Sequence, residues 1–154
     1  MQSSLSIYAG PKARAQLLEQ GVTASQFNVM VGASGGPKWF VLYGLDRYLF
    51  GTFLQERTEP LLTLGSSAGA WRMCCLATAD PVAAIDRLAK LYSEEQYSDT
   101  PTQREITLKA EAMLAGMLGP TGAAEIASNE RFLTTIVADR SRGFGSSRHK
   151  GLQT

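Results

Sequence analysis

The sequence predicts an α/β domain with a mostly parallel sheet, and three observations support this prediction. Short apolar runs recur along the chain, two of them lead into glycine-rich turns, and amphipathic stretches of helical period separate them. Strands that alternate with helices are joined by crossover connections, which favour parallel pairing. We therefore expect a three-layer α/β/α domain over residues 1–138, followed by a loose basic tail over residues 139–154.

The N-terminal half is predicted to contain an extended arm or strand, a helix, a strand, a buried helix, a strand and a further helix. Their ranges are 5–8, 11–20, 28–31, 39–55, 61–64 and 70–78. Pro11 suits the start of the first helix and Gly21 its end. Each of the two later strands leads into a glycine turn and then a helix, so a strand–turn–helix unit occurs twice.

The C-terminal half is predicted to contain two long helices, a short helix and a strand. Their ranges are 81–96, 103–118, 123–127 and 131–138. Asp80 suits the N-cap of the first of these helices and Pro81 its first position. The last range has the clearest strand pattern of the chain and reads as buried. Because a sheet of this class would ordinarily continue beyond such a strand, we expect the chain to be the N-terminal part of something longer or a naturally short form.

Composition excludes several classes of protein. The chain has 154 residues, of which 44% are hydrophobic and 19% charged, and its net charge is +1. The apolar residues are enough to form one hydrophobic core. Because positive and negative charges balance, the protein has no overall electrostatic field that would attract nucleic acid. The sequence shows neither a signal-peptide pattern nor an apolar run long enough to span a membrane. The adjacent Cys74 and Cys75 read as reduced core residues, so we expect a cytoplasmic protein without a metal or cofactor.

The turn at residues 65–69 matches the pattern G-x-S-x-G with Ser67 at its centre. In hydrolases this pattern presents a nucleophilic serine between a strand and a helix, which is the context predicted here. The alternative is an ordinary strand-to-helix turn in which Ser67 caps the helix.

The turn at residues 32–38, Gly-Ala-Ser-Gly-Gly-Pro-Lys, also joins a strand to a helix. A phosphate-binding Walker loop is excluded because Pro37 stands where its second glycine should be and Trp39 replaces the metal-binding hydroxyl. A dinucleotide-binding loop is excluded because Ser34 occupies its second glycine position.

Two interpretations of this turn remain. The amides of Gly35 and Gly36, with Lys38 as a nearby cation, suit an oxyanion hole beside Ser67, since one strand–helix–strand unit separates the two turns. The alternative is a turn that serves packing alone.

The two turns together resemble the patatin-like phospholipases. Residues 32–38 look like the oxyanion motif of that family, residues 65–69 look like its serine motif, and the matched region spans about residues 28–78. The resemblance implies a Ser–Asp pair without histidine, a lipid acyl ester as substrate and no metal. In that family the catalytic aspartate precedes a glycine, and no aspartate of this chain does so.

Asp139 is the candidate base that remains, because it follows the last predicted strand in a stretch that resembles the one preceding the family's aspartate motif. The alternative role for Asp139 is a salt bridge with the neighbouring Arg140 or Arg142. A triad of Ser67, Asp139 and His149 has the chain order of other hydrolases, but His149 lies in the glycine-, serine- and arginine-rich tail.

The sequence thus supports a serine acyl-ester hydrolase that acts on lipid or phospholipid esters, with Ser67 as nucleophile. We expect a lipid substrate, transient contact with a membrane surface and no nucleic-acid partner. Two alternatives stay open. One is a non-catalytic module that binds an anionic group at Gly35, Gly36 and Lys38, and the other is an inactive fragment that lacks the aspartate of the pair.

Overall fold

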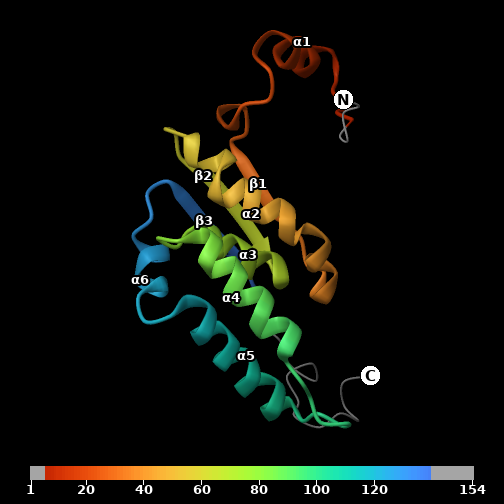
Figure 1. Cartoon of the computed structure of the whole chain (residues 1–154), viewed down its shortest axis with the longest axis vertical. Helices are drawn as coiled ribbons and strands as arrows, with labels where there is room; N and C mark the ends of the chain where they lie inside the picture. Colours follow the sequence, from red (N-terminus) through yellow and green to blue (C-terminus); the bar gives the residue numbers. More distant parts are fainter. Residues whose placement is uncertain (1–5, 140–154) are drawn as a thin grey trace.

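The computed structural model describes residues 6–139 and has a mixed α/β fold (Figure 1). Its strands are β1 (Val29–Gly32), β2 (Leu61–Ser66) and β3 (Phe132–Val137). Its α-helices are α1 (Pro11–Gln20), α2 (Tyr43–Gly51), α3 (Ala68–Leu76), α4 (Pro81–Glu94), α5 (Gln103–Leu118) and α6 (Gly122–Ala127). Three short 3₁₀ helices complete the list: η1 (Ala24–Gln26), η2 (Gly36–Leu42) and η3 (Phe53–Glu56).

The three strands form one parallel sheet in the order β1, β2, β3. Gly32 at the end of β1 is the register partner of Gly65 near the end of β2. Because the strands are parallel, the turns that follow β1 and β2 leave the sheet at the same edge. The prediction of a parallel sheet whose strands are connected through helices is confirmed.

Helix α3 lies against one face of the sheet, where it contacts all three strands, and α2, α4 and α5 are arranged around it (Figure 1). The core lies between these helices and the sheet. Its fully buried side chains include Phe50, Leu61, Met73, Ile85 and Met117. The predicted start of α4 is confirmed, since the Asp80 carboxylate accepts a hydrogen bond from the backbone N–H of Ala83 at 2.9 Å.

The opposite face of the sheet is open to solvent within residues 6–139. Apolar side chains that alternate with the buried ones are 42–66% exposed there: Val29, Val31, Leu62, Leu133 and Val137. The described residues therefore form one layer of helices on the sheet, and the second helical layer predicted from the sequence is not among them. Strand β3 was expected to be buried, but only Phe132 at its start is. Within residues 6–139, β3 is an edge strand that pairs with β2 alone.

The predicted helix over residues 39–55 is instead three consecutive pieces: η2, α2 and η3. It is also less buried than expected, because Val41, Leu45 and Tyr48 are more than half exposed. Residues 6–10 form no strand, and Tyr8 is 93% exposed. The tail predicted to be loose lies outside the described residues apart from Asp139.

Two buried arginines fasten this arrangement. Arg72 of α3 donates two hydrogen bonds, of 2.6 and 2.7 Å, to the carboxylate of Asp46 on α2, and both side chains are almost completely buried. Arg57 donates to backbone carbonyls in the segments that precede β1 and β2, namely those of Ala24 and Phe27 before β1 and of Glu59 and Pro60 before β2. A buried guanidinium is tolerated when its N–H groups are paired in this way.

Candidate functional site

Ser67 lies in the tight turn between β2 and α3, and its backbone is strained. Its φ of 53° and ψ of −129° make it the one residue other than glycine with a positive φ among residues 6–139. Such a conformation costs about 1–3 kcal/mol and persists where the surrounding structure enforces it. The side chain is exposed, and no hydrogen bond within the described residues engages its hydroxyl. The turn thus presents a free serine hydroxyl at the edge of the sheet.

Glycines enforce this turn because the chain passes itself at very short range. A Cβ at Gly69 would lie 1.9 Å from the carbonyl oxygen of Gly32, and a Cβ at Gly65 would lie 2.4 Å from the Cα of Ala70. Both contacts are with backbone, which has little freedom to move. The first and last glycines of the G-x-S-x-G pattern are therefore sterically required, and Gly69 also brings the start of α3 against the end of β1.

The second turn, after β1, carries the other predicted site residues. Gly36 has a positive φ of 50° and begins η2, whereas Gly35 has open space where a Cβ would stand. The first N–H groups of a helix have no acceptor within it, so the amides here are available to a ligand. Lys38 is exposed and does not line the cavity described below. The sequence predicted a long helix directly after this turn, but the first segment is a 3₁₀ helix of seven residues.

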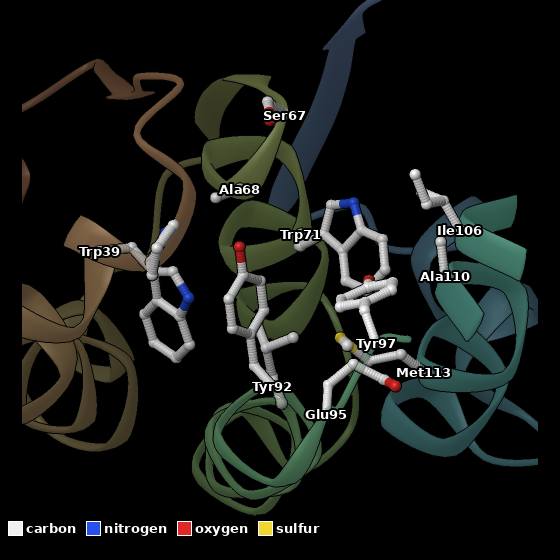
Figure 2. A pocket seen from close by; sticks show the side chains of 12 residues that line it. Trp39, Ser67, Ala68, Trp71, Tyr92, Glu95, Tyr97, Ile106, Ala110 and Met113 are labelled. Carbon is white, nitrogen blue, oxygen red and sulfur yellow. The ribbon is translucent and has the colours of Figure 1, made fainter. Parts of the chain in front are cut away.

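A cavity of about 550 Å³ opens beside Ser67 (Figure 2). Pro37 and Trp39 line it from the first turn, and Ser67 and Ala68 line it from the second, so the two predicted turns do meet at one site. Most of the remaining wall is apolar or aromatic and comes from α3, α4 and α5: Trp71, Leu88, Tyr92, Ile106, Ala110 and Met113.

Tyr92 of α4 stands in the middle of this cavity. Its hydroxyl oxygen is 4.0 Å from the position that a Cβ at Gly36 would occupy, and in Figure 2 it points toward Ala68. Burial, followed by the proximity of Tyr97, raises the pKa of Tyr92 above its usual value. The hydroxyl therefore keeps its proton at neutral pH and can donate a hydrogen bond.

Trp39 is only 3% exposed, and its ring packs edge-on against Tyr92 with 6.1 Å between the centroids. Among the buried polar side-chain atoms of residues 6–139, its indole Nε1 is the one that has no hydrogen-bond partner. In Figure 2 this nitrogen lies on the side of the ring that faces Tyr92.

The opposite end of the cavity holds a charged cluster, away from Ser67 (Figure 2). The carboxylate of Glu95 accepts a hydrogen bond of 2.9 Å from Lys109 Nζ, which also lies 4.9 Å from the centroid of the Tyr97 ring. This hydrogen bond from Lys109 to Glu95 is the main reason why the pKa of Lys109 is raised. The negative charge of Glu95 is therefore already compensated within the protein.

Asp139 is exposed and follows β3 at the edge of the sheet from which Ser67 projects. Val137 pairs with Ser66, so the chain after β3 continues beside the turn that holds Ser67. His149, Arg140 and Arg142 lie outside the described residues.

Other reactive groups do not contribute to this site. Cys74 and Cys75 are unpaired and buried in α3, and burial raises the pKa of both thiols, which leaves them in the unreactive neutral form. Within residues 6–139, no three Cys, His, Asp or Glu side chains are grouped so that they could hold a metal ion. In the same part of the chain, no helix has both the length and the apolar character needed to cross a membrane.

Comparison of the chain with protein-family models, with curated proteins and with solved structures finds no match.

Sequence reasoning located the two turns but missed most of the cavity wall. Trp39 and Tyr92 lie in the helices predicted over residues 39–55 and 81–96, where apolar side chains at helical spacing usually belong to the core. The contribution of α5 has a recognisable signal, since Ile106, Ala110 and Met113 follow one another at helical spacing on one face.

Proposed function

We propose that this protein is a serine acyl-ester hydrolase of the patatin-like type, and that its domain has the three-layer fold of that family. The observation that carries the proposal is the strained conformation of Ser67 in a glycine-locked turn that borders a largely apolar cavity. A serine held at positive φ between a strand and a helix is the arrangement by which many hydrolases present a nucleophile. The two buried, unpaired cysteines support a reducing, cytoplasmic location.

In the proposed reaction the Ser67 Oγ attacks the carbonyl carbon of an ester and loses its proton to a base. The amides of Gly35 and Gly36 donate hydrogen bonds to the carbonyl oxygen as it gains negative charge. The C–O bond to the alcohol then breaks, the alcohol leaves with a proton, and the acyl group stays on Ser67. Water hydrolyses this acyl-enzyme and regenerates the serine.

The cavity suits the acyl part of such a substrate. Its walls are mainly carbon, so an acyl chain that enters it leaves water and gains from apolar burial. We propose a lipid or another water-insoluble ester as the substrate class, delivered by transient contact with a membrane surface.

The mechanism needs a base that accepts the proton of the Ser67 hydroxyl. Asp139 is the candidate because the register of β2 and β3 carries the chain past the Ser67 turn. A positioned carboxylate would accelerate the attack by about 10²–10⁴-fold.

Labelling with a fluorophosphonate tests the proposal without knowledge of the substrate. Attack by Ser67 forms an O–P bond and expels fluoride, so we expect one adduct per chain in an intact-mass spectrum. Ser67→Ala should abolish the adduct, whereas Ser66→Ala, at the last residue of β2, should keep it.

Absence of labelling in the folded native protein, or equal labelling of Ser67→Ala, would refute the hydrolase proposal. Asp139→Asn sharpens the test, with Asp99→Asn in the loop between α4 and α5 as its control. A labelling rate that falls by about 10²-fold or more only in Asp139→Asn identifies the base. An unchanged rate assigns that role to another group.

The alternative is a non-catalytic module that binds an anion at the first turn. It is favoured by the backbone N–H groups of Gly35 and Gly36, which have no acceptor within η2. Calorimetry with inorganic phosphate separates this module from the hydrolase. Binding of phosphate by the native protein, together with the absence of fluorophosphonate labelling, would favour the module.

A further inference from the structure

Helices α4 and α5 lie antiparallel and form one wall of the cavity, and polar contacts at both ends fix their register. Lys109 Nζ of α5 donates a hydrogen bond of 2.9 Å to the carboxylate of Glu95 at the end of α4. Toward the other end, Arg87 of α4 donates one of 2.9 Å to the backbone carbonyl of Met117 on α5. The residues that line the cavity between these two contacts therefore have fixed heights along the wall.

The cavity becomes more buried from a rim to a floor along this wall. On α5 the exposed fraction falls from 45% at Ile106 to 6% at Met113, with Ala110 between them, and Figure 2 shows the three side chains in that order. On α4 the Leu88 side chain is 1% exposed, whereas the side chain of Glu95 is 20% exposed. Each pair is seven residues apart, which corresponds to a rise of about 10 Å in an α-helix. Leu88 and Met113 thus form a floor about 10 Å below the rim.

The cavity is large for this depth. An apolar cavity of about 150 Å³ is enough to hold one benzene molecule. The volume of about 550 Å³ is more than three times that value, so the cavity has to be broader than one extended hydrocarbon chain. Because Ser67 is exposed, the carbonyl that it attacks lies at the rim, and the acyl group points toward the floor.

The walls present aromatic rings from three parts of the chain: Trp71 of α3, Tyr92 of α4 and Tyr97 of the loop that follows α4. The ring of Tyr97 is held in place at the rim, since Lys109 Nζ lies 4.9 Å from its centroid and donates to the backbone carbonyl of Gln96. Aromatic side chains contribute large, rigid apolar surfaces. A cyclic group that packs between them has few rotatable bonds to fix, whereas a straight chain has to be ordered along its whole length.

We propose that the cavity is an acyl site for short, broad acyl groups, either cyclic or branched, and that it disfavours long straight chains. Met113 limits the depth of the site, and Ala110 provides its width at mid-height because a larger side chain there would project between the aromatic walls. This inference rests on the proposed hydrolase function for the reaction, but the shape preference can be measured by binding alone.

The first test is a binding experiment on the native protein with two ketones that resemble methyl esters but cannot be hydrolysed. Cyclohexylacetone and 2-nonanone have equal numbers of carbon atoms and differ in that one carries a ring and the other a straight chain. The chain has five methionines, so methyl-¹³C-methionine spectra are simple, and Met113→Leu assigns the Met113 resonance.

We expect the Met113 methyl resonance to shift and saturate, with cyclohexylacetone binding about 3–10-fold more tightly than 2-nonanone. Met30 of β1 does not line the cavity, and its resonance should stay in place. Equal or tighter binding of 2-nonanone, or a Met113 resonance that ignores both ketones, would overturn the proposal.

The second test compares hydrolysis of the p-nitrophenyl esters of cyclohexylacetic acid and octanoic acid, which also have equal numbers of carbon atoms. Each kcat/KM is divided by the rate constant for hydroxide hydrolysis of the same ester, which removes the difference in intrinsic reactivity. The corrected ratio should favour the cyclic ester in the native enzyme.

Ala110→Leu should lower this ratio by about 5-fold or more, because the added side chain occupies the width that a ring needs. The matched control is Ala112→Leu, at an exposed position of α5 that does not line the cavity, and it should leave the ratio unchanged. The same ratio in Ala110→Leu as in the native enzyme would contradict the proposal.

The two proposals fail in different ways. Tighter binding of the cyclic ketone by a protein that the fluorophosphonate does not label would support the shape preference and refute the hydrolase. Labelling of Ser67 together with equal binding of the two ketones would support the hydrolase and refute the shape preference.

Discussion

The turn after β2 and the turn after β1 lie side by side, yet glycine has a different physical role in each. In the β2 turn, Gly65 and Gly69 leave no room for a Cβ, because backbone atoms of Ala70 and Gly32 occupy that space. In the β1 turn, Gly35 has open space around it, and Gly36 has only the Tyr92 hydroxyl within 4.0 Å.

The glycines of the β2 turn are therefore required by packing, whereas Gly35 in the β1 turn is not. The tight turn has its shape whether or not a substrate is present, because steric contact forces Ser67 into its strained conformation. The open turn has no such packing reason for Gly35, because a Cβ there would meet no other atom within 4 Å. Substitutions in the two turns should therefore affect different properties.

The largest effect is expected for Gly69→Ala. The new methyl group would overlap the backbone of Gly32, so α3 has to move away from β1, and the protein should lose at least about 3 kcal/mol of stability or fail to fold. Urea unfolding followed by circular dichroism measures this loss.

Two glycines provide matched controls. Gly44→Ala on α2 introduces a methyl group into open space and should stabilise its helix by about 0.5–1 kcal/mol. Gly35→Ala should leave stability within about 1 kcal/mol of the native value. If Gly69→Ala is as stable as these two, the close approach of the two turns does not exist.

A second large effect is expected from the ion pair that joins the helices behind the two turns. Asp46→Ala leaves the guanidinium of Arg72 buried without its partner, which should cost about 3–5 kcal/mol in thermal or urea unfolding.

The double variant Asp46→Leu/Arg72→Met removes both charges and should recover much of that loss. A double variant that is no more stable than Asp46→Ala would contradict the assignment of the cost to an unpaired buried charge.

The smallest effect is expected at Ser67, where the sign of the stability difference between two variants reports on backbone strain. Ser67→Gly relieves the strain of a positive φ, whereas Ser67→Ala retains it, so the glycine variant should be the more stable of the two by about 1 kcal/mol. At the preceding position the order should reverse, because Ser66 belongs to β2 and glycine weakens a strand. The same order at both positions would show that Ser67 is not strained.

The sequence predicted the framework of this site well because its signals are local. Proline and glycine at helix ends, the Asp80 N-cap and the apolar runs before each turn all act within a few residues, and the elements they predict are present. The G-x-S-x-G pattern predicted the strand-to-helix turn that holds Ser67 for the same reason, because a turn this tight admits only small residues beside the serine.

The cavity was not predictable in this way because it is formed by distant parts of the chain. Tyr92 and Trp39 have the spacing of ordinary core residues, and only the packing of α4 against η2 and α3 shows that both border a hollow. The exposure of β3 also depends on distant packing, because the strand pattern of residues 131–138 does not reveal which strands or helices cover it.

The pairing of β2 with β3 has a consequence for how the protein folds. Thr63 and Thr134, whose hydroxyl groups lie 3.4 Å apart across these strands, are 71 residues apart in the chain. The β1–β2 pair closes a loop of roughly half that length, and it encloses only η2, α2 and η3. Because long loops close more slowly, the β1–β2 unit with its adjoining turns should form first. The side of β2 that faces away from β1 should remain unpaired until β3 joins the sheet. During synthesis the serine turn can therefore be complete well before the sheet that supports it.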